Sequence, residues 1–158
     1  LPVIKEMKEI HIRSNEIFIP KQKTTGTLAN MLIDGFIPTI EVIEGADSLA
    51  FTFDTGAKAT MLYSSYYLRN KAKIESKYEA EEIEFGGAGG TIKVKGFRLE
   101  DLLLKIGNSK LKLSNVRVIA ENIKDHDKGY FGNLGQDYMS EFGEMILNFE
   151  DMYVDFKK

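Results

Sequence analysis

Short apolar segments, each of alternating character and each followed by a turn, fill most of the chain after residue 35. Alternation with a period of two places every second side chain on one face, which is typical of a half-buried β-strand. Two such strands joined by a short turn pair as an antiparallel hairpin. The expected pairs are Phe36–Glu44 with Ser48–Phe53, Glu82–Phe85 with Thr91–Phe97, Arg98–Ile106 with Lys110–Ala120, and Met145–Phe149 with Met152–Phe156. This pattern predicts a mostly β domain, built as a barrel or a sandwich.

Other segments depart from this pattern. Ser64–Asn70 predicts one short helical turn, and Gln136–Phe142 predicts the one convincing helix, a short helix near the end of the chain. In the first part of the chain, Glu16–Pro20 alternates like a strand that ends at a proline, and a polar turn or linker follows at Lys21–Thr27.

These differences suggest two parts. We expect residues 1–35 to be an N-terminal extension or linker, and residues 36–158 to be the folded domain. Because the first residue is Leu1 rather than methionine, we also expect the chain to be a piece of a longer protein. The part before it would be a signal peptide, a tag or a whole preceding domain.

Composition excludes several classes of protein. The 158 residues suit one domain, and 43% hydrophobic residues are enough to bury a core. A net charge of −3 without a basic stripe argues against a nucleic-acid partner. No apolar run approaches the length of a membrane span.

Composition also bears on cofactors. The absence of cysteine excludes disulfides, thiolate catalysis and cysteine-based zinc sites. A lone histidine in a polar segment is usually a surface residue, so neither His11 nor His126 is assigned a role. With so few ligands of the right type, we expect no metal and no cofactor.

The sharpest chemical feature is an aspartate at the end of an apolar strand, followed by small residues: Asp54, Thr55, Gly56 and Ala57. This order places a carboxylate at a tight turn. Gly56 lets the backbone approach another group closely, and Thr55 can form hydrogen bonds that lock the loop. The tripeptide also occurs in ordinary hairpins, in which aspartate and glycine are turn formers.

The second feature is a run of small residues between two strand-like arms: Gly86, Gly87, Ala88, Gly89 and Gly90. Such a tip moves easily and offers bare backbone N–H groups to a ligand, although a simple flexible hairpin has the same composition. A phosphate-binding loop would need a helix after the glycines. Thr91–Lys95 instead alternates like a strand, which excludes that interpretation.

The third feature is an apolar residue and a glycine, Leu134 and Gly135, directly before the late helix. Taken alone, this segment could be an ordinary loop that leads into a helix, with Gln136 or Asp137 favouring the positive helix end.

Together, the order and spacing of the three features resemble the retropepsin family of aspartic peptidases. The glycine hairpin is similar to the flap of retroviral proteases. The resemblance covers about residues 36–156, with longer connections at 63–80 and 124–131 than in the viral enzymes. Asn133 stands where the family usually has an apolar residue. The resemblance implies a mostly β fold, a retropepsin-like closed barrel equivalent to half of an acid protease, with one short C-terminal helix.

The resemblance further implies an aspartic endopeptidase, which hydrolyses peptide bonds with a water molecule activated by paired aspartates. Asp54 would be the catalytic residue, and Thr55, Gly56 and Ala57 would support its loop. Gly86–Gly90 would be the flap that covers a peptide or protein substrate. Leu134 and Gly135 would form the second motif of the site.

The chain has one Asp-Thr-Gly, whereas the mechanism needs two carboxylates that share a proton. A partner must therefore supply the second aspartate, either as a second copy in a homodimer or as a related upstream domain, which would make a pseudo-dimer. Terminal strands such as Met152–Phe156 would contribute to a homodimer interface, as retropepsin termini commonly do.

Two other functions stay open from the sequence. One is a catalytically weak or inactive peptide-binding or assembly domain of the same fold. The other is an unrelated β-barrel binder, such as a small-molecule carrier. Cleavage of an unfolded protein, lost on Asp54→Asn, would separate the active peptidase from the inactive domain.

Overall fold

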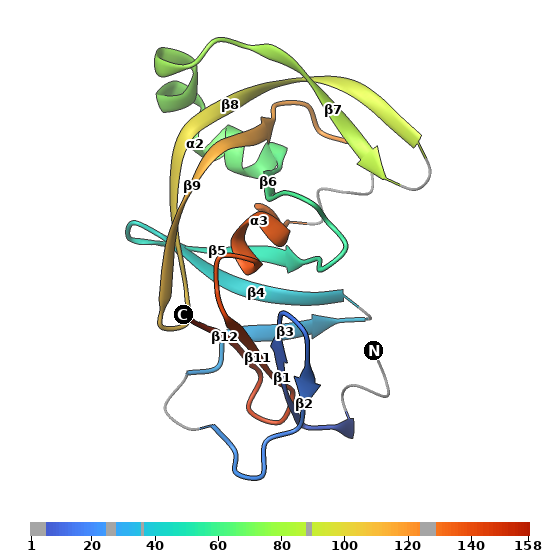
Figure 1. The fold of residues 1–158 in the computed structure, drawn as a ribbon. Coiled ribbons are helices and arrows are strands. Elements are labelled where there is room, and N and C mark those ends of the chain that lie inside the picture. Colours follow the sequence, from blue (N-terminus) through green and yellow to red (C-terminus); the bar gives the residue numbers. More distant parts are fainter. Residues whose placement is uncertain (1–5, 25–27, 36, 88–89, 124–128) are drawn as a thin grey trace.

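The computed structural model describes residues 6–24, 28–35, 37–87, 90–123 and 129–158, and these residues form two β-sheets (Figure 1). The larger sheet has eight strands in the order β3 (Met31–Asp34), β4 (Ile37–Glu44), β5 (Asp47–Phe53), β10 (Gly132–Leu134), β6 (Met61–Leu62), β9 (Ser109–Ile119), β8 (Gly90–Ile106) and β7 (Glu81–Gly87). The smaller sheet has four strands in the order β12 (Tyr153–Lys157), β11 (Glu144–Asn148), β1 (Glu9–Arg13) and β2 (Ile17–Phe18). The predicted mostly β fold is confirmed.

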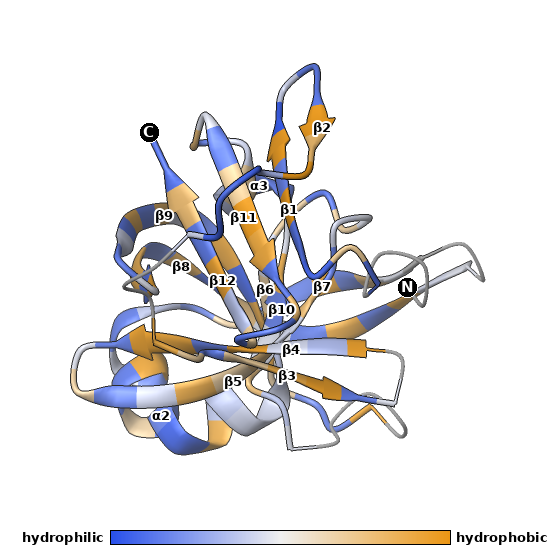
Figure 2. Cartoon of the chain, turned by 90° about the horizontal axis from the view of Figure 1, so that it is seen from below, coloured by the Kyte–Doolittle hydropathy of each residue, from blue (hydrophilic) through white to orange (hydrophobic). Residues whose placement is uncertain are grey.

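All four expected hairpins form as antiparallel pairs: β4 with β5, β7 with β8, β8 with β9, and β11 with β12. Hydrophilic and hydrophobic residues alternate along β8 and β9, as the colours of Figure 2 show. The segments expected as separate strands at 91–97 and 98–106 are one continuous strand of 17 residues. The alternation changes phase inside it, since the buried positions Val94 and Gly96 are followed by Phe97 and Leu99.

The late helix is found as α3 (Gln136–Met139), which is shorter than expected. A longer helix, α2 (Ser64–Lys77), occupies the segment where only one helical turn was predicted. Its second half is rich in Lys, Glu and Ala, which are strong helix formers. Ile74 is the one aliphatic side chain that this half buries, so the sequence carries little helical periodicity there. No helix in the described part of the chain is both long enough and apolar enough to span a membrane.

Residues 1–35, expected to be an extension or linker, supply strands to both sheets. β1 lies between β11 and β2, and β3 pairs with β4 at the edge of the larger sheet. The division of the chain at residue 35 stays a prediction, but these hydrogen-bonded strands join the segment to the rest of the fold.

His11, expected at the surface, is buried in β1 with only 5% of its area exposed. Its Nε2 lies 2.8 Å from Glu9 Oε1, and its Nδ1 contacts Glu144 Oε1 on β11. No local pattern predicts that His11 is buried, because the second carboxylate that contacts it comes from a strand at the other end of the chain. His126 lies outside the described residues.

A set of aromatic rings connects α3 to β12. Tyr138 is fully buried, and its ring centroid lies 5.3 Å from those of both Phe142 and Phe156. The rings therefore hold the short helix against the C-terminal hairpin, and this contact fixes the position of the segment just before the helix.

Candidate active site

Strand β5 delivers Asp54 to the surface from the core. Leu49, Phe51 and Phe53 of this strand are buried, whereas Asp54 is exposed directly after its end. β5 pairs with β4 on one side and, in parallel, with β10 on the other. The Asp54 N–H donates to the Leu134 carbonyl at 3.2 Å, so the strand ends in a fixed position.

The Asp54 loop is a tight turn stabilised by its own backbone. The Gly56 N–H donates to Asp54 Oδ1 at 2.9 Å, and the Ala57 N–H donates to the Asp54 carbonyl at 3.1 Å. A Cβ atom added to Gly56 would lie 3.3 Å from Asp54 Oδ1, which is a tight contact. A glycine at this position therefore donates to the carboxylate without crowding it.

Gln136, the first residue of α3, holds the other side of this loop. Its backbone N–H donates to the Ala57 carbonyl at 2.9 Å, and its side-chain Nε2 donates to the Thr55 carbonyl at 2.7 Å. This bond reaches the backbone carbonyl of Thr55, and the supporting role expected of Thr55 itself stays a prediction. Sequence reasoning did not single out Gln136 for this contact, although its place directly after the Leu134–Gly135 pair was the available signal.

A buried polar group lies behind the loop. Thr60, with 1% of its area exposed, donates from both its backbone N–H (2.8 Å) and its hydroxyl (2.7 Å) to Asp137 Oδ1. The same hydroxyl accepts the Gly135 N–H at 3.1 Å. These bonds connect the β5–β6 connection to the start of α3. Asp137 was not predicted as part of the site.

Gly135 occupies a place where a larger residue would clash with the backbone. A Cβ atom there would lie 2.4 Å from the Ala59 carbonyl carbon and 2.7 Å from the Thr60 nitrogen. Leu134, just before it, is fully buried in the core. The structure therefore brings the third sequence feature directly against the first.

A cleft of about 860 Å³ separates the Asp54 loop from the glycine hairpin. Asp54, Gly56 and Ala57 line it from the loop, and Phe85, Gly86, Gly90 and Ile92 line it from the β7–β8 hairpin. Figure 1 shows this hairpin at the top of the molecule, at the opposite end from the four-stranded sheet. Loop and hairpin, about thirty residues apart in the sequence, thus face a common space.

The described part of the hairpin shows why glycine is needed there. Gly86 has a φ angle of 154°, and a Cβ atom on it would lie 2.1 Å from the Gly90 carbonyl oxygen. Gly87 pairs with Gly90 at the end of the ladder. Ala88 and Gly89, the remaining residues of the expected flap, lie outside the described residues.

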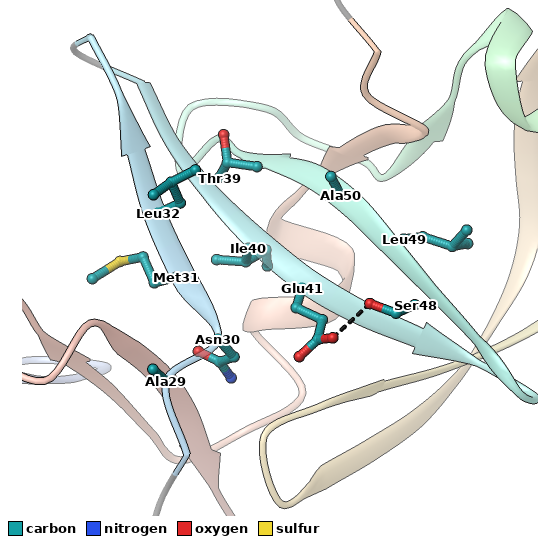
Figure 3. Close-up of a pocket in the computed structure, with 10 residues that line it drawn as sticks. All are labelled: Ala29, Asn30, Met31, Leu32, Thr39, Ile40, Glu41, Ser48, Leu49 and Ala50. Atoms are coloured by element: carbon teal, nitrogen blue, oxygen red, sulfur yellow. Dashed lines mark hydrogen bonds between the residues drawn. The ribbon is translucent and has the colours of Figure 1, made fainter.

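A second, smaller concavity of about 370 Å³ lies on strands β3, β4 and β5 (Figure 3). Glu41 is the one carboxylate among the described residues that line it, and it accepts a hydrogen bond from the Ser48 hydroxyl at 2.5 Å. None of the three sequence features reaches this concavity. The candidate active site is therefore the larger cleft, which Asp54 lines.

The cleft has room for a ligand between apolar side chains and an exposed carboxylate. Met61, Tyr63, Phe85, Ile92 and Ile123 supply the apolar part of its lining. Asp54 is the one carboxylate among the described residues that line it. Within the described residues, no group of three or more His, Cys, Asp or Glu side chains is placed to hold a metal ion.

No family model matches the sequence, and no curated protein matches it. Among solved structures, the chain is similar to the EIAV protease complexed with the inhibitor HBY-793, with 21% identity and a TM-score of 0.43, over 66% of this chain and 86% of that one. It is also similar to a retropepsin-like aspartic protease from Rickettsia conorii, with 17% identity and a TM-score of 0.49, over 85% of this chain and 98% of that one.

These two similarities are likenesses alone, and the retropepsin-like resemblance continues to rest on the three sequence motifs and on their arrangement in the structure. At this level of identity and overlap the likeness does not extend to residue roles. The roles proposed below follow from the geometry of the chain itself.

Proposed function

We propose that this chain is one protomer of an aspartic endopeptidase, with Asp54 as its catalytic residue and a partner that supplies the second aspartate. The observation that carries the proposal is the position of Asp54. Its carboxylate is exposed at the end of a buried strand, is held by a backbone N–H, and faces a glycine hairpin across a large cleft.

The chemistry needs two carboxylates because a neutral water is a weak nucleophile and an amide carbonyl is a weak electrophile. One ionised carboxylate takes a proton from the water, and one protonated carboxylate polarises the carbonyl oxygen. Two carboxylates a few ångström apart share a single proton, since both cannot ionise at that distance. Asp54 is the one carboxylate among the described residues that line the cleft, and it can be either ionised or protonated at a given moment, but not both. A second carboxylate must therefore take the other role.

A second copy of the chain is the simplest partner. In a symmetric dimer the same surface meets itself, so two exposed Asp54 loops would approach each other across the two-fold axis. The bonds from Gln136 to the carbonyls of Thr55 and Ala57 would hold each loop in place while they meet. An upstream domain with its own Asp-Thr-Gly would satisfy the same chemistry.

The C-terminal strand β12 is already engaged within its own chain. The Asn30 side chain donates to the Val154 carbonyl at 2.9 Å and accepts the Val154 N–H at 2.7 Å, and the Ser109 hydroxyl contacts the Phe156 carbonyl. We therefore centre the proposed interface on the Asp54 loops, and a contribution from Met152–Phe156 stays a prediction.

The substrate would be a peptide in extended conformation. An extended chain pairs its backbone with neighbouring strands and points alternate side chains into pockets. The β7–β8 hairpin would close over it, exclude water and so strengthen the electrostatic interactions of the carboxylates.

The test is cleavage of an unfolded protein by the parent chain and by Asp54→Asn. The substitution keeps size and polarity but removes the base, so the rate should fall by roughly 1,000-fold or more. Asp34→Asn is the matched control, because Asp34 is exposed and also precedes a glycine, yet it accepts a bond from Tyr130 outside the cleft. Equal cleavage by Asp54→Asn and the parent would refute the proposal.

A further inference from the structure

Two cations lie in the lining of the Asp54 cleft, and the proposed peptidase mechanism uses neither. Lys58 follows the Asp54 loop directly, and Arg117 lies on β9, where it pairs with Met61 of β6. Asp54 is the one carboxylate among the described lining residues. The chain as a whole has a net charge of −3, so this cleft differs in sign from the average of the molecule.

Arg117 differs from the other arginines of the chain in its partner. Arg13, Arg69 and Arg98 each form an ion pair with a carboxylate. In the described part of the chain, Arg117 forms no ion pair, and its guanidinium donates to the neutral carbonyl of Glu84 at 3.3 Å. A guanidinium has five N–H donors, so most of its hydrogen-bonding capacity remains for a ligand.

The nearest acidic strand does not neutralise these cations from inside the cleft. Phe85 of β7 lines the cleft, and strand alternation places Glu82 and Glu84 on the opposite face from Phe85. Glu82 forms an ion pair with Lys93 at 2.6 Å on that opposite face. Glu82 and Glu84 therefore point away from Arg117, whereas Glu81, on the same face as Phe85, forms its ion pair with Arg98 at 2.9 Å. Among the described residues of the hairpin, the group that accepts a hydrogen bond from Arg117 is the Glu84 carbonyl.

We propose that Lys58 and Arg117 are specificity-determining residues, which select peptide substrates with an acidic side chain next to an apolar one. This inference rests on the proposed peptidase function, since it names the substrate class of the same cleft. An extended peptide that places an apolar side chain against Phe85 and Ile92 brings a neighbouring side chain next to the two cations that share this lining. A Glu or Asp there accepts bonds from a fixed guanidinium and an ammonium group.

The test uses sets of three peptides that are identical except for Glu, Gln or Lys at one position near the scissile bond. A separate set is made for each position on either side of that bond. The parent chain should cleave the Glu peptide about tenfold more efficiently than the Gln peptide, the ratio that ~1.4 kcal/mol of pairing energy gives. Arg117→Gln and Lys58→Gln should each reduce this preference, and the double variant should abolish it. Lys110→Gln, which changes an exposed cation on the same strand β9 outside the cleft, should leave the preference unchanged.

A binding assay separates failure of this inference from failure of the proposed function. Labelled versions of the same peptides are titrated with the Asp54→Asn chain and followed by fluorescence anisotropy. Cleavage of all three peptides at equal rates overturns the acidic preference but leaves the peptidase intact. Tighter binding of the Glu peptide, with no cleavage of any peptide by the parent chain, supports the acidic preference and overturns the proposed peptidase function. A Glu preference that persists in the double variant overturns the role of Lys58 and Arg117.

Discussion

Thr60→Val tests whether the buried polar group behind the Asp54 loop holds the candidate active site together. Valine keeps the shape of threonine but removes the hydroxyl, which donates to Asp137 Oδ1 at 2.7 Å and accepts the Gly135 N–H at 3.1 Å. The backbone N–H of residue 60 keeps its own bond to Asp137. The substitution therefore removes one bond to a charged group and leaves one N–H without a partner.

The magnitude follows from these two changes. A hydrogen bond to a charged group contributes about 1.5–3 kcal/mol, and an unpaired buried N–H costs about 1–3 kcal/mol. Because water and small shifts recover part of the loss, we expect the free energy of unfolding to fall by about 2–4 kcal/mol. For a chain of this length that corresponds to a decrease in Tm of roughly 4–16 °C.

Activity should fall as well, because Thr60 acts through the position of the loop. A displacement of the Asp54 carboxylate by about 1 Å can reduce kcat/KM roughly 100-fold. Thr60→Ser is the matched control, since it keeps the hydroxyl and removes only a methyl group, at about 1 kcal/mol. Urea unfolding and peptide cleavage would be measured on both variants. The reasoning is refuted if Thr60→Val unfolds within about 0.5 kcal/mol of the parent, or if Thr60→Ser loses as much activity as Thr60→Val.

Three further predictions concern assembly, the flap and pH. If a second copy supplies the second aspartate, specific activity should fall on dilution below the dimer Kd, and a strictly monomeric chain with full activity would contradict the two-aspartate mechanism. Gly86→Ala forces a Cβ atom against the Gly90 carbonyl and so should disturb the hairpin, lowering Tm and lowering kcat/KM at least about tenfold, whereas an unchanged kcat/KM would show that the hairpin does not cover the site. Burial acts to raise the pKa of Glu9 and Glu144, but hydrogen bonds, led by those from His11, outweigh it and lower both pKa values below the ordinary 4.5. Their contribution to stability is therefore complete above about pH 4.5 and is lost as the pH falls through the lower folded-state values, so acid unfolding of Glu9→Gln should depend less steeply on pH than that of the parent.

The hairpins and the Asp54 loop could be predicted from the sequence because their determinants are local. Alternation specifies the face of each strand, and a turn residue between two strands specifies the pairing. The bond from Gly56 to Asp54 Oδ1 spans two residues, and the need for glycine at Gly86 follows from its own hairpin. These features need no information from distant parts of the chain.

Other features depend on contacts between distant segments, which local sequence patterns do not specify. Thr60 and Asp137 are separated by 77 positions, and they meet because β10 inserts in parallel beside β5. Nothing in the alternation of either strand specifies that pairing, since the short β10 could have paired with any open edge. Arg117 reaches the cleft for the same reason, through the parallel pairing of β9 with β6.

The N-terminal part and helix α2 show the same distinction. The alternation near residue 17, where β2 lies, was visible in the sequence. The pairing of the preceding strand β1 with β11 was not, because β11 lies about 130 residues further along the chain. α2 buries few apolar side chains, and its length depends on residues that favour a helix without marking a buried face. The four hairpins, their turns and the choice of Asp54 as the catalytic candidate therefore follow from local sequence patterns. The tertiary structure decided which distant residues hold Asp54 in place and which side chains share its cleft, because those contacts depend on how whole strands pack and pair.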